Sequence, residues 1–500
     1  MEDKLSSDNS VVKAQIATKP GEKTFFGQPL VLRTLFMTEF WERFSYYGMR
    51  AILLFYMYDA VAHGELGMNV KLATAIMAIY GSLVYMTSII SGFISDRITG
   101  TAKTILYGGI LIMIGHIILA MPIGKGALFA SIALITLGTG LLKTNVSETF
   151  GSLYEPGDLR RDLGYSIFVM GINLGSLLAP FFVSYIGQTY NCHVGFSLAA
   201  LGMALGLIVY IHHYQQLPAS SKMPTDPLTP SQRKKLLTKV VIGVGSIAAA
   251  LLILNAFHVL TGNGIVKTIT IIGVVLPIIY FIVMFRSAKV TATEKRHLHA
   301  YIYVFIAEVV FCMVLEQATV VLTLFAQNQV QLNIAGFHFQ SGQFQSLNPL
   351  FIIIYSPLFA LLWTRLGKRQ PTAATKFSWS LIFTGVAFMV MILPVWLHGT
   401  HTRVTFLWLV LSWGIMEVGE LLMSPIGLSV TSKLAPQAFK SQMMSMWFLG
   451  NAAAQAVNAQ IMPYFTPQNE IIYFGLVGGF TVVVGLIVMF LIPKINRLMA

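Results

Sequence analysis

Long apolar runs alternate with short polar segments along almost the whole chain. About fourteen runs follow one another, each close to the roughly 20 apolar residues that an α-helix needs to cross a bilayer. Their approximate centres are Phe44, Leu83, Met113, Ile135, Met170, Met203, Ala248, Val274, Cys312, Ile354, Gly385, Met416, Asn451 and Val482. The pattern therefore predicts an all-α polytopic membrane protein with about 14 transmembrane helices.

The Lys and Arg residues gather in alternate loops. The loops after even-numbered runs contain Arg97 and Lys103, then Arg160 and Arg161, then Lys222, Arg233, Lys234 and Lys235, then Lys289, Lys295 and Arg296, then Arg365, Lys368 and Arg369, then Lys433 and Lys440. The intervening loops contain single basic residues at Lys71, Lys125, Lys267 and Arg403. Because loops rich in Lys and Arg stay in the cytoplasm, we expect both termini there and an even number of spans.

A hydrophilic stretch rich in Pro and Ser, residues 212–235, interrupts the pattern. The two apolar runs after it contain no acidic residue, so we expect them to be lipid-facing additions to a core of six spans followed by six spans. The predicted divisions are a cytoplasmic tail at 1–28, a six-helix bundle at 29–214, a cytoplasmic linker at 215–236, two additional transmembrane helices at 237–286 and a second six-helix bundle at 287–500.

One loop resembles a known motif of membrane transporters. The loop at 92–100, with the sequence Gly-Phe-Ile-Ser-Asp-Arg-Ile-Thr-Gly, resembles the G-x-x-x-D-R-x-G-type motif of the major facilitator superfamily. A similar basic turn, Arg-Leu-Gly-Lys-Arg at 365–369, occupies the corresponding place in the second half. The resemblance implies two six-helix bundles related by an axis along the membrane normal.

Composition and charge support a membrane protein and exclude other classes. Hydrophobic residues make up 55% of the chain and charged residues 11%, against roughly 25% charged residues in soluble proteins. The net charge of +13 is spread over loops, so it reflects topology, and no nucleic-acid partner is expected. Two cysteines form no disulfide framework, and the polar N-terminus has no apolar core of a cleavable signal peptide.

Ionisable residues interrupt several apolar runs. They are Glu39, Glu42, Arg43, Arg50, Lys143, Glu308, Glu316, Glu417 and Glu420. Each costs about 2.5–3.5 kcal/mol at the centre of a membrane helix, so most of them are expected to serve function. For Glu308 and Arg50 the alternative is that the residue lies near the membrane surface and its side chain extends the charged group to that surface by snorkelling. In the first run, positions 39, 42, 43, 46, 47 and 50 share one helix face, which must face a wet cavity or a partner helix.

The acids in these runs outnumber the bases. The apolar runs contain six carboxyl groups and three cations, so about three carboxyl groups have no cation to pair with. A carboxyl group that is buried without a positive partner takes up a proton more readily. Reversible protonation within the membrane is what proton-coupled transport requires. Binding of Na⁺ by the surplus acids is the alternative, and the sequence does not decide between them.

Three segments resemble one transporter family. Residues 39–50, Glu-Phe-Trp-Glu-Arg-Phe-Ser-Tyr-Tyr-Gly-Met-Arg, resemble the E-x-x-E-R-F-x-Y-Y-G motif of the proton-dependent oligopeptide transporter family. Residues 165–177 are similar to its fifth-span signature, and residues 419–428 resemble its tenth family helix. The resemblance covers nearly the whole chain. It implies a proton-coupled symporter that imports di- and tripeptides by alternating access. The implied relatives are the di-/tripeptide transporters of Gram-positive bacteria, and the implied location is the bacterial plasma membrane.

The resemblance also implies roles for individual residues. Proton coupling is expected of Glu39, Glu42, Arg43, Glu316 and Lys143. Substrate contact is expected of Arg43, Tyr46, Tyr47, Tyr85, Lys143, Asn173, Asn348, Glu420, Trp447 and Asn451, although core packing is the alternative for each aromatic residue. Gating salt bridges are expected between Arg50 and Glu316 and between Lys143 and Glu420. Glu417 has no place in the family pattern.

Enzymatic and ATP-driven functions lack their motifs in this sequence. H-E-x-x-H, G-x-S-x-G and G-x-x-x-x-G-K-[ST] are all absent, so neither an enzyme nor a primary pump is expected. The expected partners are small peptides, protons and the lipid bilayer, with no cofactor or metal and a monomeric state. The alternative within transporters is a carrier of nitrate or another small anion on the same fold.

Overall fold

In this computed structural model the described residues are 24–155, 158, 160–236, 238, 261–334, 336–400 and 402–499. A short hairpin of β1 (Thr24–Phe25) and β2 (Gln28–Pro29) precedes the first long helix. A second hairpin, of β3 (Asn333–Ile334) and β4 (Phe337–His338), lies in a loop of the second half. All other regular elements in the described part of the chain are helical.

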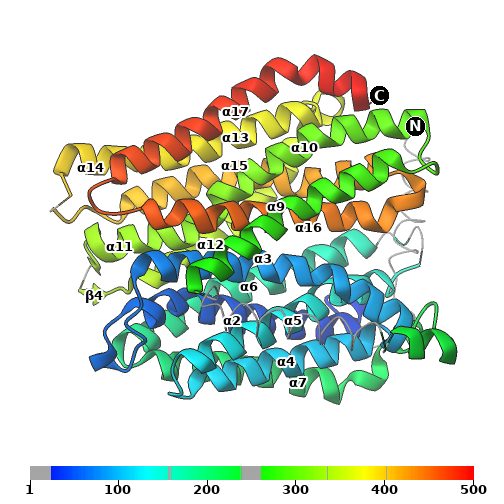
Figure 1. Ribbon diagram of the computed structural model, residues 1–500, viewed down its shortest axis with the longest axis horizontal. Coiled ribbons are helices and arrows are strands. Elements are labelled where there is room, and N and C mark those ends of the chain that lie inside the picture. The colour runs from blue at the N-terminus through cyan, green and yellow to red at the C-terminus, as the bar shows by residue number, and fades with distance from the viewer. Residues whose placement is uncertain are drawn as a thin grey trace, which may run out of the picture.

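The long helices form two groups (Figure 1). The first bundle contains α2 (Val31–Tyr58), α3 (Val70–Ile94), α4 (Thr101–Ala120), α5 (Lys125–Gly151), α6 (Arg160–Thr189) and α7 (Cys192–His212). The second contains α10 (Ala292–Gln317), α11 (Thr323–Gln329), α12 (Leu347–Leu366), α13 (Ala373–Val390), α14 (Ile392–His398), α15 (Leu407–Leu434), α16 (Lys440–Ile461) and α17 (Glu470–Met499). Helix α9 (Gly262–Arg286) belongs to neither group.

Short helical turns connect or extend these helices. They are η1 (Val61–His63), η2 (Ser95–Thr99), η3 (Tyr214–Gln216), η4 (Ala219–Lys222), η5 (Ala318–Leu322), η6 (Ser341–Ser346), η7 (Gly367–Arg369), η8 (Gln437–Phe439) and η9 (Met462–Tyr464). Two of them, η2 and η5, are π-helical turns, and η5 joins α10 to α11 in one continuous helical segment. Turns of this type inside helices occur frequently at functional sites.

The prediction of an all-α membrane protein is confirmed. Every predicted apolar run is centred within a long helix except the run centred on Ala248, which lies outside the described residues. Eleven helical segments in the described part of the chain are long and apolar enough to cross a membrane. Helices α2 and α16 are less apolar because they carry polar side chains that face the interior, as described below.

Packing within each bundle depends on glycines at helix crossings. A Cβ atom at Gly138 of α5 would lie 2.6 Å from the carbonyl oxygen of Gly108 in α4. The same arrangement recurs in the second bundle, where a Cβ atom at Gly385 of α13 would lie 2.6 Å from the carbonyl oxygen of Gly478 in α17. Small residues permit this close approach, which drives helix association where lipid removes the hydrophobic force between helices.

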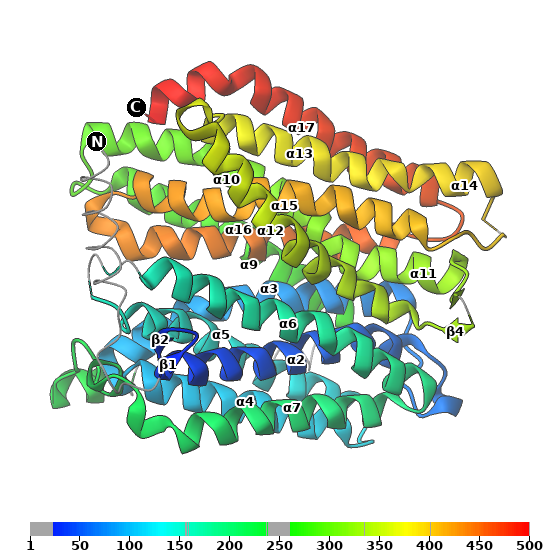
Figure 2. The same cartoon turned by 180° about the vertical axis from the view of Figure 1, so that it is seen from behind.

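The two bundles meet along α3 and α16, and α9 packs against both of these helices (Figure 1). Helix α12 crosses the second bundle obliquely (Figure 2). A row of apolar side chains on α9 is exposed, namely Ile271, Ile272, Val275, Ile278, Ile279, Ile282 and Val283. For this helix the exposure agrees with the prediction of a lipid-facing span; the other additional span lies outside the described residues.

The segment predicted as a linker packs on the first bundle. Within it, the backbone N–H of Asp226 donates to the carbonyl of Asp96 (2.9 Å), and the N–H of Leu228 donates to the carbonyl of Arg97 (3.1 Å). The carboxylate of Asp226 also pairs with Arg97. The linker is therefore bound to η2, the turn that carries the motif resembling the major facilitator superfamily.

Candidate functional site: a polar cavity between the bundles

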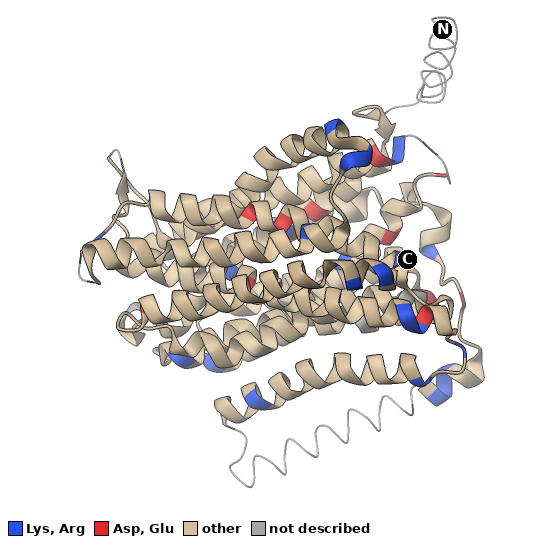
Figure 3. Ribbon diagram, turned by 90° about the horizontal axis from the view of Figure 1, so that it is seen from above, with Lys and Arg blue, Asp and Glu red and all other residues tan. Residues whose placement is uncertain are grey.

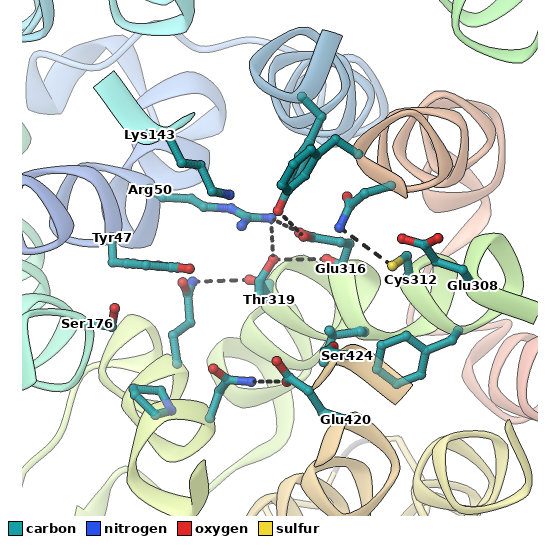
Figure 4. Close-up of a pocket in the computed structure, with 18 of the residues that line it drawn as sticks. Tyr47, Arg50, Lys143, Ser176, Glu308, Cys312, Glu316, Thr319, Glu420 and Ser424 are labelled. Atoms are coloured by element: carbon teal, nitrogen blue, oxygen red, sulfur yellow. Dashed lines mark hydrogen bonds and ion pairs between the residues drawn. The ribbon is translucent and has the colours of Figure 1, made fainter. Parts of the chain in front are cut away.

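A cavity of about 280 Å³ lies between the two bundles (Figure 4). Nine of the residues predicted for the site line it: Tyr47, Arg50, Tyr85, Lys143, Glu316, Asn348, Glu420, Trp447 and Asn451. Its other polar lining residues are Ser176, Glu308, Cys312, Thr319, Gln345 and Ser424. In the described part of the chain, many Lys, Arg, Asp and Glu residues lie near helix ends, and a smaller group lies at mid-helix (Figure 3).

An ion pair between the bundles forms one wall of the cavity. The Arg50 guanidinium on α2 lies 2.6 Å from the Glu316 carboxylate on α10 and donates to the Thr319 hydroxyl at 3.0 Å. The side-chain amide of Gln455 donates to the same carboxylate at 2.7 Å, and the Tyr85 hydroxyl lies 3.5 Å from its other oxygen. The structure thus brings together the two residues expected to form one gating pair.

The snorkelling alternative for Arg50 and Glu308 is wrong. Arg50 is 6% exposed and Glu308 is 1% exposed, and both line the cavity. Neither side chain therefore extends to the membrane surface. The partner of Arg50 lies 266 positions away in the chain, so its burial depends on tertiary contacts that the local sequence does not contain.

A charged cluster on α2 lies beside the cavity and does not line it. The Arg43 Nε donates to Glu39 at 3.2 Å and lies 2.7 Å from a Glu42 carboxylate oxygen, a contact without hydrogen-bond geometry. The Arg43 guanidinium also lies 5.8 Å from the Tyr46 ring centroid. Arg43 and Tyr46 were expected to contact substrate, but in this conformation they are buried outside the cavity lining because Arg43 is turned to its own helix.

Lys143 on α5 projects into the cavity without an acidic partner. Its ammonium group lies 4.6 Å from the ring centroid of Tyr85 and 5.9 Å from that of Phe448, distances typical of cation–π contacts. Among the described residues no ion pair includes Lys143, so its expected pairing with Glu420 is not formed in this conformation.

Asn348 joins two carboxyl groups on the opposite side. Its amide donates to Glu417 at 2.5 Å and to Glu420 at 3.1 Å. The two acids stand three positions apart on α15 and therefore share one helix face. Glu417 is completely buried. Its hydrogen bond with Asn348 could not be predicted from a local pattern, because the two residues are 69 positions apart. Asn173, which was expected to contact substrate, does not line the cavity, and its amide donates to the Val169 carbonyl of its own helix (3.0 Å).

The second bundle adds residues that the sequence analysis did not single out. They include Gln345 and Thr319 in the cavity wall and Gln455 behind it. Gln455 belongs to a polar stripe on α16 with Asn451 and Asn458, at spacings of four and three residues. That spacing puts all three on one helix face, and it was the signal in the sequence that could have identified Gln455.

The cations and the acids that line the cavity come from opposite bundles. Figure 4 shows the cationic groups of Arg50 and Lys143 on one side, and the carboxyl groups of Glu420 and Glu308 in other parts of the wall. The two cations come from the first bundle, and the three acids, Glu308, Glu316 and Glu420, come from the second. The cavity therefore offers opposite charges from opposite bundles, together with aromatic rings in its lining.

Comparison with known proteins assigns the family. A model of the POT family matches residues 102–477. The chain belongs to the POT family. A di-/tripeptide transporter of Lactococcus lactis subsp. lactis (strain IL1403) is 45% identical over 96% of this chain and 98% of its own length. The transporter YclF of Bacillus subtilis (strain 168), whose name describes it as uncharacterized, is 50% identical over 98% of this chain and 99% of its own.

Solved structures of this POT-family type are similar over the full chain. A crystal structure of a peptide transporter POT in complex with sulfate has a TM-score of 0.93 and 51% identity, covering 97% of this chain and 99% of that one. A POT family transporter in complex with a thioalcohol-conjugated peptide has a TM-score of 0.90 and 41% identity, covering 96% and 99%. This chain is therefore a polytopic membrane transporter of the POT family.

Proposed function

We propose that this POT-family chain is a proton-coupled symporter that imports di- and tripeptides across the bacterial plasma membrane by alternating access. The observation that carries the proposal is that one cavity contains Lys143 of the first bundle and Glu420 of the second, with no ion pair between them. The Lactococcus relative, a di-/tripeptide transporter at 45% identity, supports the same substrate class.

A dipeptide fits this charge pattern because both of its ends are charged. Lys143, which has no acidic partner among the described residues, is available for the peptide carboxylate. Glu420, fixed by the Asn348 amide, is available for the peptide ammonium group. Tyr47, Tyr85 and Trp447 supply amphipathic walls between them. A clamp on the two ends leaves the side chains loosely held, which suits many different peptides.

Contacts between the bundles support an assignment of the state. Turn η6 rests on α6 through bonds from Ser346 to the Leu177 carbonyl (2.7 Å), from Gln343 to the Phe181 carbonyl (2.9 Å) and from the Gly342 N–H to Gln188 (3.2 Å). We take this end to be the outer one, because its loops belong to the set that contains few basic residues. In this proposal the cavity is closed to the outside and faces the cytoplasm, where both termini and the linker at 215–236 also lie.

Proton coupling is proposed to act through the two buried charge clusters. Protonation of Glu316 would remove the charge that attracts Arg50 and so release the contact that closes the outer side. Glu39 and Glu42, which share one guanidinium, form the second candidate proton site. Pairing of Lys143 with Glu420 would then close the cytoplasmic side as the bundles rock around the site.

Blocking the ends of the peptide tests the two-ended clamp. We expect N-acetyl-Ala-Ala and Ala-Ala-amide each to compete at least about tenfold more weakly than Ala-Ala for binding to the purified protein, because each loses a charge-assisted hydrogen bond. The measurement is displacement of labelled Ala-Ala. Equal competition by the blocked and unblocked peptides would refute the clamp, and equal displacement by nitrate would favour an anion carrier.

A further inference from the structure

Glu308 is a buried acid in the cavity wall that has no part in the proposed transport cycle. It lies on α10, eight positions before Glu316, so the backbone positions of the two residues are about 12 Å apart along the helix axis. The side chain is 1% exposed, and its Oε2 atom has no hydrogen-bond partner. Among the described residues no ion pair includes Glu308.

The neighbouring helix α16 leaves space for this carboxyl group and adds a second acceptor. A Cβ atom at Gly450 would lie 3.0 Å from the Glu308 carboxyl carbon, so glycine allows the acid to lie close to the backbone there. The next residue, Asn451, donates its amide to the sulfur of Cys312 at 3.5 Å, and its Oδ1 has no partner. Figure 4 shows the Glu308 carboxyl group beside Cys312. This corner of the cavity therefore contains two unpartnered acceptor oxygens, one of them acidic.

The chemistry of the corner suits one kind of ligand. Burying a carboxylate without a positive partner costs free energy, and an unpaired buried oxygen adds to that cost. A primary ammonium or a guanidinium group supplies both the positive charge and the hydrogen-bond donors. An apolar side chain would leave both oxygens unpaired, and an acidic side chain would be repelled.

We propose that Glu308 and Asn451 form a subsite for the cationic side chain of peptides that contain Lys or Arg. The inference rests on the proposed function, because it takes the peptide ends to be held elsewhere in the cavity, at Lys143 and Glu420. Those two residues and the corner line the same cavity. Glu308 then determines specificity among peptides and is not part of the clamp on the peptide ends.

Competition with two matched dipeptides tests the subsite. Ala-Lys and Ala-norleucine have side chains of similar length, and only Ala-Lys carries an ammonium group. We expect purified protein to bind Ala-Lys more tightly than Ala-norleucine, and Glu308→Gln to lower this preference by roughly tenfold or more. The measurement is displacement of labelled Ala-Ala in the two proteins. A preference unchanged by Glu308→Gln would overturn the inference.

Glu470→Gln is the matched control. Glu470 is also 1% exposed and lies in the second bundle, but it bonds Gln329 and does not line the cavity. The preference for Ala-Lys should be the same in this variant as in the unaltered protein. An equal fall in the control would also overturn the inference, because the effect would then be a general one of removing a buried acid.

The design separates failure of the inference from failure of the proposed function. If the unaltered protein binds no dipeptide at all, the proposed function itself is wrong. If it binds Ala-Ala but Glu308→Gln leaves the preference unchanged, only the subsite is wrong. Should Glu308→Gln not yield folded protein, Glu308→Asp draws the carboxylate back by one methylene group. We expect that change to lower the preference by about threefold, and an unchanged preference would again contradict the subsite.

Discussion

Replacing Glu316 by Gln should abolish proton-driven accumulation of peptide while leaving counterflow exchange in place. The amide has the shape of the protonated acid but no titratable proton, and it removes the charge that attracts Arg50, which lies 2.6 Å away in an ion pair. Binding and exchange do not need the proton to be released, whereas accumulation does. The measurement compares uptake of labelled Ala-Ala under a proton gradient with exchange against unlabelled peptide in the same proteoliposomes.

The Glu470→Gln variant is the control for this experiment as well. Glu470→Gln removes another buried acid whose side chain bonds Gln329 and lies outside the cavity lining, so this variant should retain gradient-driven accumulation. Full accumulation in Glu316→Gln would show that this carboxyl group does not carry the coupling. Loss of both accumulation and exchange would indicate damage to the site or the fold, and would equally remove support for the assigned role.

Replacing Lys143 by Ala should weaken peptide binding by about 10- to 100-fold, the value of a hydrogen bond to a charged group. Lys143 is the cation in the cavity wall that has no acidic partner among the described residues. Its charge therefore neutralises no other group of the protein when the site is empty. Driven uptake should fall with it, because the pairing with Glu420 that closes the cytoplasmic side is lost. Displacement of labelled Ala-Ala and gradient-driven uptake measure the two effects separately.

Lys376 offers a matched control for this change. Its ammonium group lies 4.0 Å from the Trp363 ring centroid, so it makes the same type of cation–π contact that Lys143 makes with Tyr85. It lies on α13, outside the cavity lining. Lys376→Ala should leave binding and uptake close to those of the unaltered protein. Similar losses in the two variants, or no loss in Lys143→Ala, would contradict the role of Lys143.

The sequence was sufficient for the fold because membrane helices leave a strong local signal. Runs of apolar residues located the long helices, and the three-and-four spacing of Glu39, Glu42 and Arg43 correctly put them on one face of α2. The spacing did not show which way that face points. The structure places these three residues beside the cavity instead of in its wall, because Arg43 is held by two carboxylates of its own helix.

Contacts between distant segments were not available from the sequence. Glu417 and Asn348 are 69 positions apart, and Gln455 and Glu316 are 139 positions apart, so neither hydrogen bond follows from a local pattern. For Glu308 a position near the membrane surface stayed open as an alternative, because an apolar run does not reveal how deep its acid lies. The pairing of Arg50 with Glu316 was expected only from resemblance to the family, and the structure shows the contact itself.

The energy of one proton is sufficient for the proposed transport. Inward movement of one charge supplies about 2.3 kcal/mol per 100 mV, and a difference of one pH unit supplies about 1.36 kcal/mol. Together they amount to roughly 3.7 kcal/mol, which supports accumulation of a net-neutral peptide by several hundred-fold. A single titrating carboxyl group, such as Glu316, therefore meets the energetic requirement.

Uptake of labelled Ala-Ala into proteoliposomes that contain the purified protein is the most direct test of proton-coupled peptide transport. With an acidic exterior and a negative interior, we predict accumulation above the external concentration, its loss when a protonophore collapses the gradient, and competition by unlabelled dipeptides but not by nitrate or a sugar. Uptake that only equilibrates whatever the gradient, or that nitrate blocks as well as a dipeptide does, would contradict the account.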